Sequence, residues 1–188
     1  ETSPITGLKV KEAVKKRQAS LVTVETLQPA IDTLSNITNL ALQHFTTQPA
    51  QFSNTVLGVT KAVIEANLVD AAVAQQAPAF VQRLTSALQG TSWEALEAAT
   101  GQSRAQWAEA ATVLAKANRL VILVGNGVLR HPGGDATVTN LLDLLILLGK
   151  LDKPGCGLGP LAEENNDQGA VEMGAVAEFF PGPAPLDD

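Results

Sequence analysis

A run of five apolar residues, Leu120 to Val124, stops at Gly125 and constrains the fold more than any other stretch of the sequence. A strand that is apolar at every position is typical of a parallel sheet covered on both faces. A longer apolar stretch, Ala136–Leu148, has the length of a helix, and Asp135 stands where it can cap that helix. A buried parallel strand followed by a buried helix predicts an α/β fold.

The sequence before this run carries further helix and strand signals. Pro4 begins a helix that ends in a basic cluster, and Ser20–Val24 is rich in β-branched residues, which predicts another parallel strand. Thr38–His44 fits either a short strand or part of a helix. Further helices are predicted from Ser53 or Asn54 to Ile64 and near Pro78–Leu88. Another helix is predicted over Ser92–Thr100, with Thr91 and Glu94 as a capping box at its start and Gly101 as the residue that ends it. The next helix follows Ser103, which forms a second capping box with Gln106.

The composition changes after Gly149. Residues 150–188 hold five of the ten prolines and six of the fifteen glycines, and no helical or strand period is visible there. We therefore expect an α/β domain over 1–149 and a loop-rich segment over 150–188, packed on that domain or on parts of a longer chain. The sequence starts at Glu1 without a methionine, so we expect a fragment of a longer parent protein.

The composition argues against several classes of function. The net charge of −6 argues against nucleic acid as a partner, and the apolar runs are too short to span a bilayer. Cys156 is the single cysteine, and His44 and His131 lie far apart in the sequence. We therefore predict no metal site, no catalytic residue, and no bound iron, molybdenum or zinc in this chain alone. Cys156 is interpreted as an inert small side chain.

A glycine-rich turn follows the apolar run and is the main candidate for ligand binding. Gly125-Asn126-Gly127 is followed by His131 and then by a second glycine pair, and glycines after a buried strand allow a ligand to approach the backbone. The spacing is neither that of a dinucleotide-binding fingerprint, because Arg130 replaces the third glycine, nor that of a P-loop. A dinucleotide contact and a purely structural turn both remain open.

Five stretches, in a fixed order along the chain, have a recognisable pattern. They are residues 1–4 with the basic helix after them, 120–128 with His131, 149–157, 165–170 leading to Met173-Gly174, and 180–182. Together they resemble the molybdopterin oxidoreductase family, which includes formate dehydrogenases and the large G subunit of NADH-quinone oxidoreductase (respiratory complex I). The Glu1-Thr2-Ser3-Pro4 opening favours the complex I subunit.

The resemblance implies a Rossmann-like, three-layer parallel-sheet fragment of a domain that embraces a molybdopterin guanine dinucleotide. It implies that the iron–sulfur clusters lie elsewhere in the parent protein. Carried over by position, the residues that would line the cofactor cleft are Gly125, Asn126, Gly127 and His131 on one side, and Asn165, Asn166, Gln168 and Gly169 on the other.

Two departures from the family pattern predict that the cofactor is lost in this chain. Relatives place Asp-Pro-Arg after the first strand, where this chain has Glu25 and neither proline nor arginine. Relatives carry a Gly-Gln pair with an upstream arginine before the second loop, where this chain has Ala162-Glu163-Glu164. Carboxylates near a pyrophosphate repel it, and arginine is its bidentate donor.

Three hypotheses for the function follow. The first is a scaffold fragment of the complex I G subunit, in which the rest of the parent chain and other hydrophilic-arm subunits are the partners. Its location would be cytoplasmic, peripheral to the inner membrane. The second is a cofactor-binding fragment of a molybdopterin enzyme such as formate dehydrogenase. The third is a free-standing nucleotide-binding module.

Overall fold

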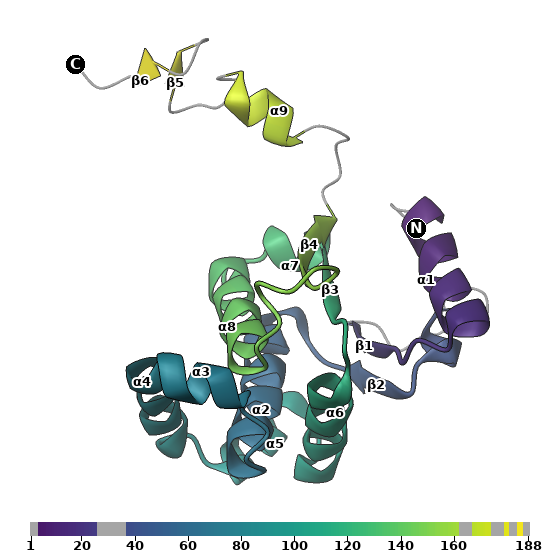
Figure 1. Cartoon of the computed structure of the whole chain (residues 1–188). Coiled ribbons are helices and arrows are strands. Elements are labelled where there is room, and N and C mark those ends of the chain that lie inside the picture. Colours follow the sequence, from purple (N-terminus) through teal and green to yellow (C-terminus); the bar gives the residue numbers. More distant parts are fainter. Residues whose placement is uncertain (1–3, 26–36, 162–166, 174–178, 181–183, 186–188) are drawn as a thin grey trace.

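The computed structural model describes residues 4–25, 37–161, 167–173, 179–180 and 184–185 of the chain. They form a mixed α/β structure (Figure 1). The helices are α1 (Pro4–Arg17), α2 (Phe52–Glu65), α3 (Ala71–Gln76), α4 (Pro78–Gln89), α5 (Trp93–Thr100), α6 (Arg104–Lys116), α7 (Asn126–Leu129), α8 (Gly134–Leu147) and α9 (Asp167–Glu172), with the 3₁₀ turns η1 (Thr38–Leu40) and η2 (Pro49–Gln51). The strands are β1 (Val22–Glu25), β2 (Gln43–Thr46), β3 (Val121–Gly125), β4 (Gly157–Leu161), β5 (Phe179–Phe180) and β6 (Ala184–Pro185).

The described strands form three separate pairs. β1 and β2 are parallel, with Val22 opposite Gln43. β3 and β4 are also parallel, with Val121 opposite Gly157 and Gly125 opposite Leu161. β5 and β6 form a short antiparallel pair. The predicted α/β class with parallel strands is therefore confirmed, and each parallel sheet has two strands within the described residues.

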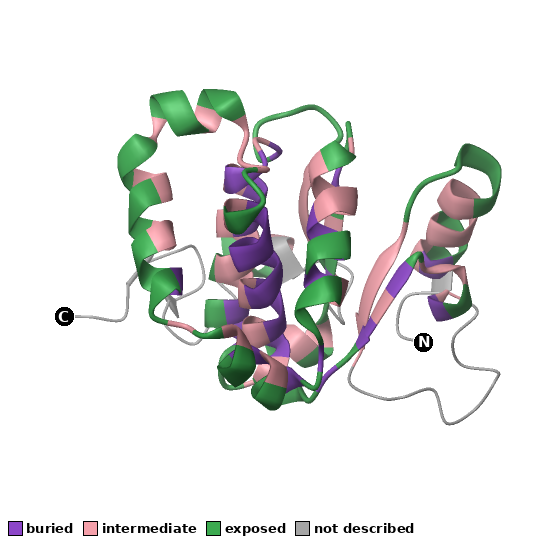
Figure 2. Ribbon diagram, turned by 90° about the horizontal axis from the view of Figure 1, so that it is seen from below, coloured by how far each residue is buried: buried purple, intermediate pink, exposed green. Residues whose placement is uncertain are grey.

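The hydrophobic core is built around α2. In Figure 1, α2 lies between α6 and α8, and Figure 2 shows the buried residues gathered in the middle of this helical layer. The apolar residues of α2 recur at the spacing that places them on one side of a helix. The buried core comprises Phe45, Val56, Val59, Ala62, Val63, Leu96, Trp107, Ala110, Ala111, Leu120, Leu144, Leu145 and Leu148.

Several local predictions are confirmed. Ser103 and Gln106 form the expected capping box at the start of α6, and Gly101 ends α5 in the left-handed conformation, with φ of 72°. The other capping box is wrong by one residue, because the side chain of Ser92, not Thr91, accepts a hydrogen bond from the Ala95 amide. The ambiguous stretch from Thr38 contains both a 3₁₀ turn and the start of β2.

Two other predictions are corrected. β3 is not buried on both faces in this chain, since Val121 and Leu123 are exposed while Val124 is buried. Its parallel partner β4 lies in the segment where the sequence indicated no regular structure. Glycine and proline make β4 a poor strand by intrinsic preference, and pairing with β3 determines its conformation. Among the described residues, no helix is long and apolar enough to cross a membrane.

Asp143 is a half-buried carboxylate within the apolar second half of α8. Burial raises the pKa of its carboxyl above the usual 3.8, and the charge of Arg83 partly opposes that rise. An acid whose pKa is higher in the folded than in the unfolded state destabilises the fold once it is charged. This cost is complete above the folded-state pKa and absent below pH 3.8.

We therefore expect Asp143→Asn to raise the thermal unfolding midpoint at pH 7 and to leave it unchanged near pH 3. Thermal melts monitored by circular dichroism at the two pH values measure this difference. Asp135→Asn, at an exposed position in the first turn of α8, is the matched control and should give no gain at pH 7. Equal gains from Asp143→Asn at both pH values would show that the buried charge is not the cause.

Candidate functional site

The glycine-rich turn lies at the carboxyl end of a parallel strand, as the sequence indicated. β3 ends at Gly125 and α7 begins at once at Asn126, so no loop separates strand from helix. Gly125 and Gly127 are exposed, and Asn126 and His131 are half-buried. Open α/β proteins bind ligands outside the carboxyl ends of their parallel strands, so these four predicted residues are brought together at a suitable edge.

The space over the two glycines of this turn is empty. A Cβ atom built on Gly125 or Gly127 meets no atom within 4 Å. Gly125 has an ordinary backbone conformation, with φ of −75°, and neither residue has a positive φ. Nothing in the described part of the chain therefore requires glycine at these two positions. This open space fits the close approach of a ligand, such as a pyrophosphate, to the backbone.

The second glycine pair has a different role. A Cβ atom on Gly134 would lie 2.5 Å from the carbonyl oxygen of Val128 and 2.7 Å from that of Leu129. Gly133 has φ of 140°, and its carbonyl accepts hydrogen bonds from the amide and hydroxyl of Thr137. These two glycines allow α8 to begin directly against α7, so their role is structural.

The other half of the predicted cleft is only partly described. Asn165 and Asn166 lie outside the described residues, and Gln168 and Gly169 belong to α9. Figure 1 draws α9 beyond the end of β4 and away from the layer formed by α2 and α8. The predicted proximity of this half to Gly125–Gly127 stays a prediction.

Glu25, the residue in place of the family's aspartate, lies at the carboxyl end of β1. Its Oε1 accepts a hydrogen bond of 2.5 Å from the hydroxyl of Thr38. On the same sheet face, His44 Nδ1 lies 2.8 Å from the hydroxyl of Thr23 and His44 Nε2 lies 3.1 Å from that of Thr46. These side chains contact one another within the chain, and the hydrogen bond from Thr38 occupies only one of the two acceptor oxygens of Glu25.

Cys156 and the acidic and histidine residues form no metal centre in the described part of the chain. The Cys156 sulfur accepts a hydrogen bond from the Leu120 amide at 3.3 Å and lies 3.8 Å from the Asn118 carbonyl oxygen. No group of three His, Cys, Asp or Glu residues that could hold a metal ion is found among the described residues.

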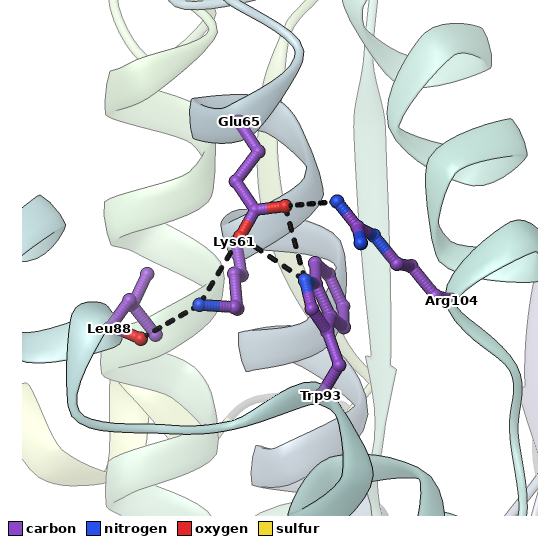
Figure 3. Close-up of polar contacts among 5 residues, drawn as sticks. All are labelled: Lys61, Glu65, Leu88, Trp93 and Arg104. Carbon is purple, nitrogen blue, oxygen red and sulfur yellow. Dashed lines mark hydrogen bonds and ion pairs between the residues drawn. The ribbon is translucent and has the colours of Figure 1, made fainter.

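A second polar cluster joins α2, α4, α5 and α6 (Figure 3). The carboxylate of Glu65 accepts hydrogen bonds from the Trp93 indole at 3.1 Å and from Arg104 at 2.7 Å. Lys61 donates to the Leu88 carbonyl at 3.0 Å and lies 3.3 Å from Glu65. This cluster was not predicted from the sequence, although Lys61 and Glu65 have the i, i+4 spacing of an ion pair.

A cavity of about 210 Å³ opens beside this cluster. Lys61, the one basic group that lines it, donates to the Leu88 carbonyl and is paired with Glu65. The cluster links four helices. The lining residues are Lys61, Ile64, Glu65, Thr85, Leu88 and Gln89.

The short parallel sheets with helices against them, and the glycine turn at the end of a parallel strand, are features of an open α/β fold. A family model identifies the family to which the chain belongs. Residues 1–184 match the model for molybdopterin oxidoreductase, so the chain belongs to the molybdopterin oxidoreductase family.

Two relatives of the chain are formate dehydrogenases. The chain is 36% identical over 120 residues to formate dehydrogenase H of Escherichia coli (strain K12), which covers 64% of this chain and 17% of that protein. It is 31% identical over 120 residues to the F420-dependent formate dehydrogenase 1 subunit alpha of Methanococcus maripaludis, which covers 64% of this chain and 18% of that protein. These matches span less than a fifth of each relative's length.

A solved structure supports the fold. Acetylene hydratase from Pelobacter acetylenicus superimposes with a TM-score of 0.68 at 14% identity, over 80% of this chain and 20% of that chain. The family predicted from the sequence is confirmed by the family model that matches residues 1–184. The relatives named here are formate dehydrogenases, so the finer expectation of a complex I subunit is not supported by them.

Proposed function

We propose that the chain is part of a molybdopterin-dependent oxidoreductase related to formate dehydrogenases, and that its Gly125–Gly127 turn lies against the cofactor. The observation that carries this proposal is the empty space over two glycines that the described chain does not itself require. When bound, the cofactor supplies oxidation and reduction at molybdenum. The residues that would hold it are Gly125, Asn126, Gly127 and His131, together with Asn165, Asn166, Gln168 and Gly169.

A pair of glycine substitutions tests this role. We expect Gly125→Ala to keep the unfolding free energy within about 0.5 kcal/mol of wild type, because the added methyl group meets no atom. In the parent protein the same change should lower the bound pterin and molybdenum at least tenfold, because it fills the space for the ligand. Pterin fluorescence after acid release and elemental analysis measure the two quantities.

Gly134→Ala is the matched control at the other end of the same turn. Its methyl group would meet two backbone carbonyl oxygens, which cannot move aside as a side chain can. We expect a cost of about 2 kcal/mol or more in unfolding free energy. If Gly125→Ala leaves the pterin content unchanged in a parent protein that does contain pterin, the turn is structural only.

The second candidate is the G subunit of NADH-quinone oxidoreductase, with this chain as a scaffold that has lost the cofactor. The sequence Ala162-Glu163-Glu164 favours it, because two carboxylates near a pyrophosphate would repel it. This candidate would place the protein on the cytoplasmic side of the inner membrane, among the hydrophilic-arm subunits. A parent protein that contains iron but no molybdenum or pterin would support it and contradict the first proposal.

Calorimetry with GDP separates the scaffold from the candidates that bind a nucleotide, which include a free-standing nucleotide-binding module. The two acidic residues Glu163 and Glu164 would repel a pyrophosphate nearby, so we expect GDP to bind this chain weakly or not at all. A low-micromolar dissociation constant for GDP would contradict that expectation, indicate a retained nucleotide site and favour the molybdopterin enzyme over the scaffold.

A further inference from the structure

Asn126-Gly127 is the only asparagine–glycine pair in the sequence, and it stands within the glycine-rich turn that follows β3. The amide of an asparagine is thermally labile, and glycine has no Cβ atom to hinder the approach of its own backbone nitrogen to the side chain before it. Gly127 is exposed, and a Cβ atom added to it would meet no atom within 4 Å. The structure therefore leaves the Gly127 nitrogen sterically accessible.

The backbone of this pair lies in the first turn of a very short helix. Gly127 is the second residue of α7, so its amide has no acceptor inside the helix, and it has none elsewhere among the described residues. Rotation about Asn126, which brings its side-chain Cγ to this nitrogen, breaks the hydrogen bond of 2.9 Å from the Arg130 amide to the Asn126 carbonyl. A helix of four residues has little stability of its own, so a local opening makes this rotation accessible.

We propose that Asn126 is a site of spontaneous deamidation, which places a carboxylate in the glycine-rich turn and weakens anion binding there. The Gly127 nitrogen forms a bond to Cγ of Asn126, the side-chain nitrogen leaves as ammonia with the former amide hydrogen, and a cyclic succinimide results. Water then opens the ring at either of its carbonyls, which gives aspartate or isoaspartate. Water is the only co-reactant, and nothing is oxidised or reduced.

The effect on the turn rests on the proposed function, whereas the modification itself does not. A negative charge introduced beside a pyrophosphate would repel it. Asn126→Asp carries the charge of the product, and Asn126→Gln keeps an uncharged amide. In the parent protein we expect Asn126→Asp to lower the bound pterin and molybdenum at least about fivefold more than Asn126→Gln does.

Incubation of the isolated chain at mildly alkaline pH tests the modification. Peptide mapping with fragmentation that distinguishes aspartate from isoaspartate measures the rate at each asparagine. We expect Asn126 to react at least about tenfold faster than Asn67 and Asn118, which are exposed but are followed by leucine and arginine. Gly127→Ala should slow the reaction at Asn126 about tenfold and leave the fold intact, because its methyl group meets no atom.

Equal rates at Asn126 and at the two control asparagines would overturn the inference, as would an unchanged rate in Gly127→Ala. Deamidation at the expected rate, with equal pterin content in Asn126→Asp and Asn126→Gln, would overturn the effect on the turn. A parent protein without pterin would contradict the proposed function and that effect, but it would not alter the rates in the isolated chain. A failure of the deamidation site is therefore separate from a failure of the cofactor proposal.

Discussion

Leu145→Asp is expected to abolish cooperative folding of the chain. Leu145 is completely buried on α8, within the cluster that packs around α2. Removing its side chain alone costs about 2–5 kcal/mol, and a charge without a partner in that position adds a desolvation cost. The sum approaches the total stability of an ordinary domain, which is about 5–15 kcal/mol. Urea unfolding followed by tryptophan fluorescence measures the loss.

Two further variants make this result interpretable. Leu145→Ala should unfold cooperatively with a free energy of unfolding about 2–5 kcal/mol below wild type, which gives a measurable value if the aspartate variant does not fold. Thr139→Asp places the same charge at an exposed position of the same helix and should change stability by less than about 0.5 kcal/mol. Equal melting of Leu145→Asp and wild type would contradict the burial of α8.

Gly58→Ala is expected to push α2 away from α6 and so to lower the free energy of unfolding. α2 and α6 approach so closely that a Cβ atom on Gly58 would lie 2.6 Å from Cδ2 of Trp107, whose side chain is completely buried. Alanine is favoured over glycine in a helix by about 1 kcal/mol, but overpacking a rigid buried ring costs about 1–3 kcal/mol or more. We therefore expect a net loss of up to about 2 kcal/mol, measured by urea unfolding.

The clash can be assigned by a double-mutant cycle. Trp107→Leu removes the indole atoms that the added methyl group would meet, including the indole nitrogen, which has no hydrogen-bond partner among the described residues. In that background the cost of Gly58→Ala should fall by more than half. Gly90→Ala is the control, because its Cβ atom would lie 3.8 Å from the nearest atom and its φ of −72° suits alanine. An additive cycle would show that the indole is not the obstacle.

Local signals in the sequence were sufficient to predict much of the helical layer and the place of the glycine turn. The capping box at Ser103 and the stop at Gly101 depend on neighbouring residues only, and both are present. The apolar run before Gly125 indicated a parallel strand, because a continuous apolar run is typical of parallel strands whichever strand pairs with it. The position of the candidate site followed from that strand, since its carboxyl end is where the turn must lie.

Other features depended on contacts between residues distant in the sequence. β4 contains glycine and proline, so only pairing with β3 makes it a strand. The contact of Gly58 with Trp107 and the cluster around Glu65 exist because separate helices pack together, which no local pattern encodes. The sequence by itself determined the caps, the parallel strand and the glycine turn, because these arise from neighbouring residues. Only the tertiary structure decided which glycines are held by packing and which leave open space, because that depends on the atoms brought opposite each one.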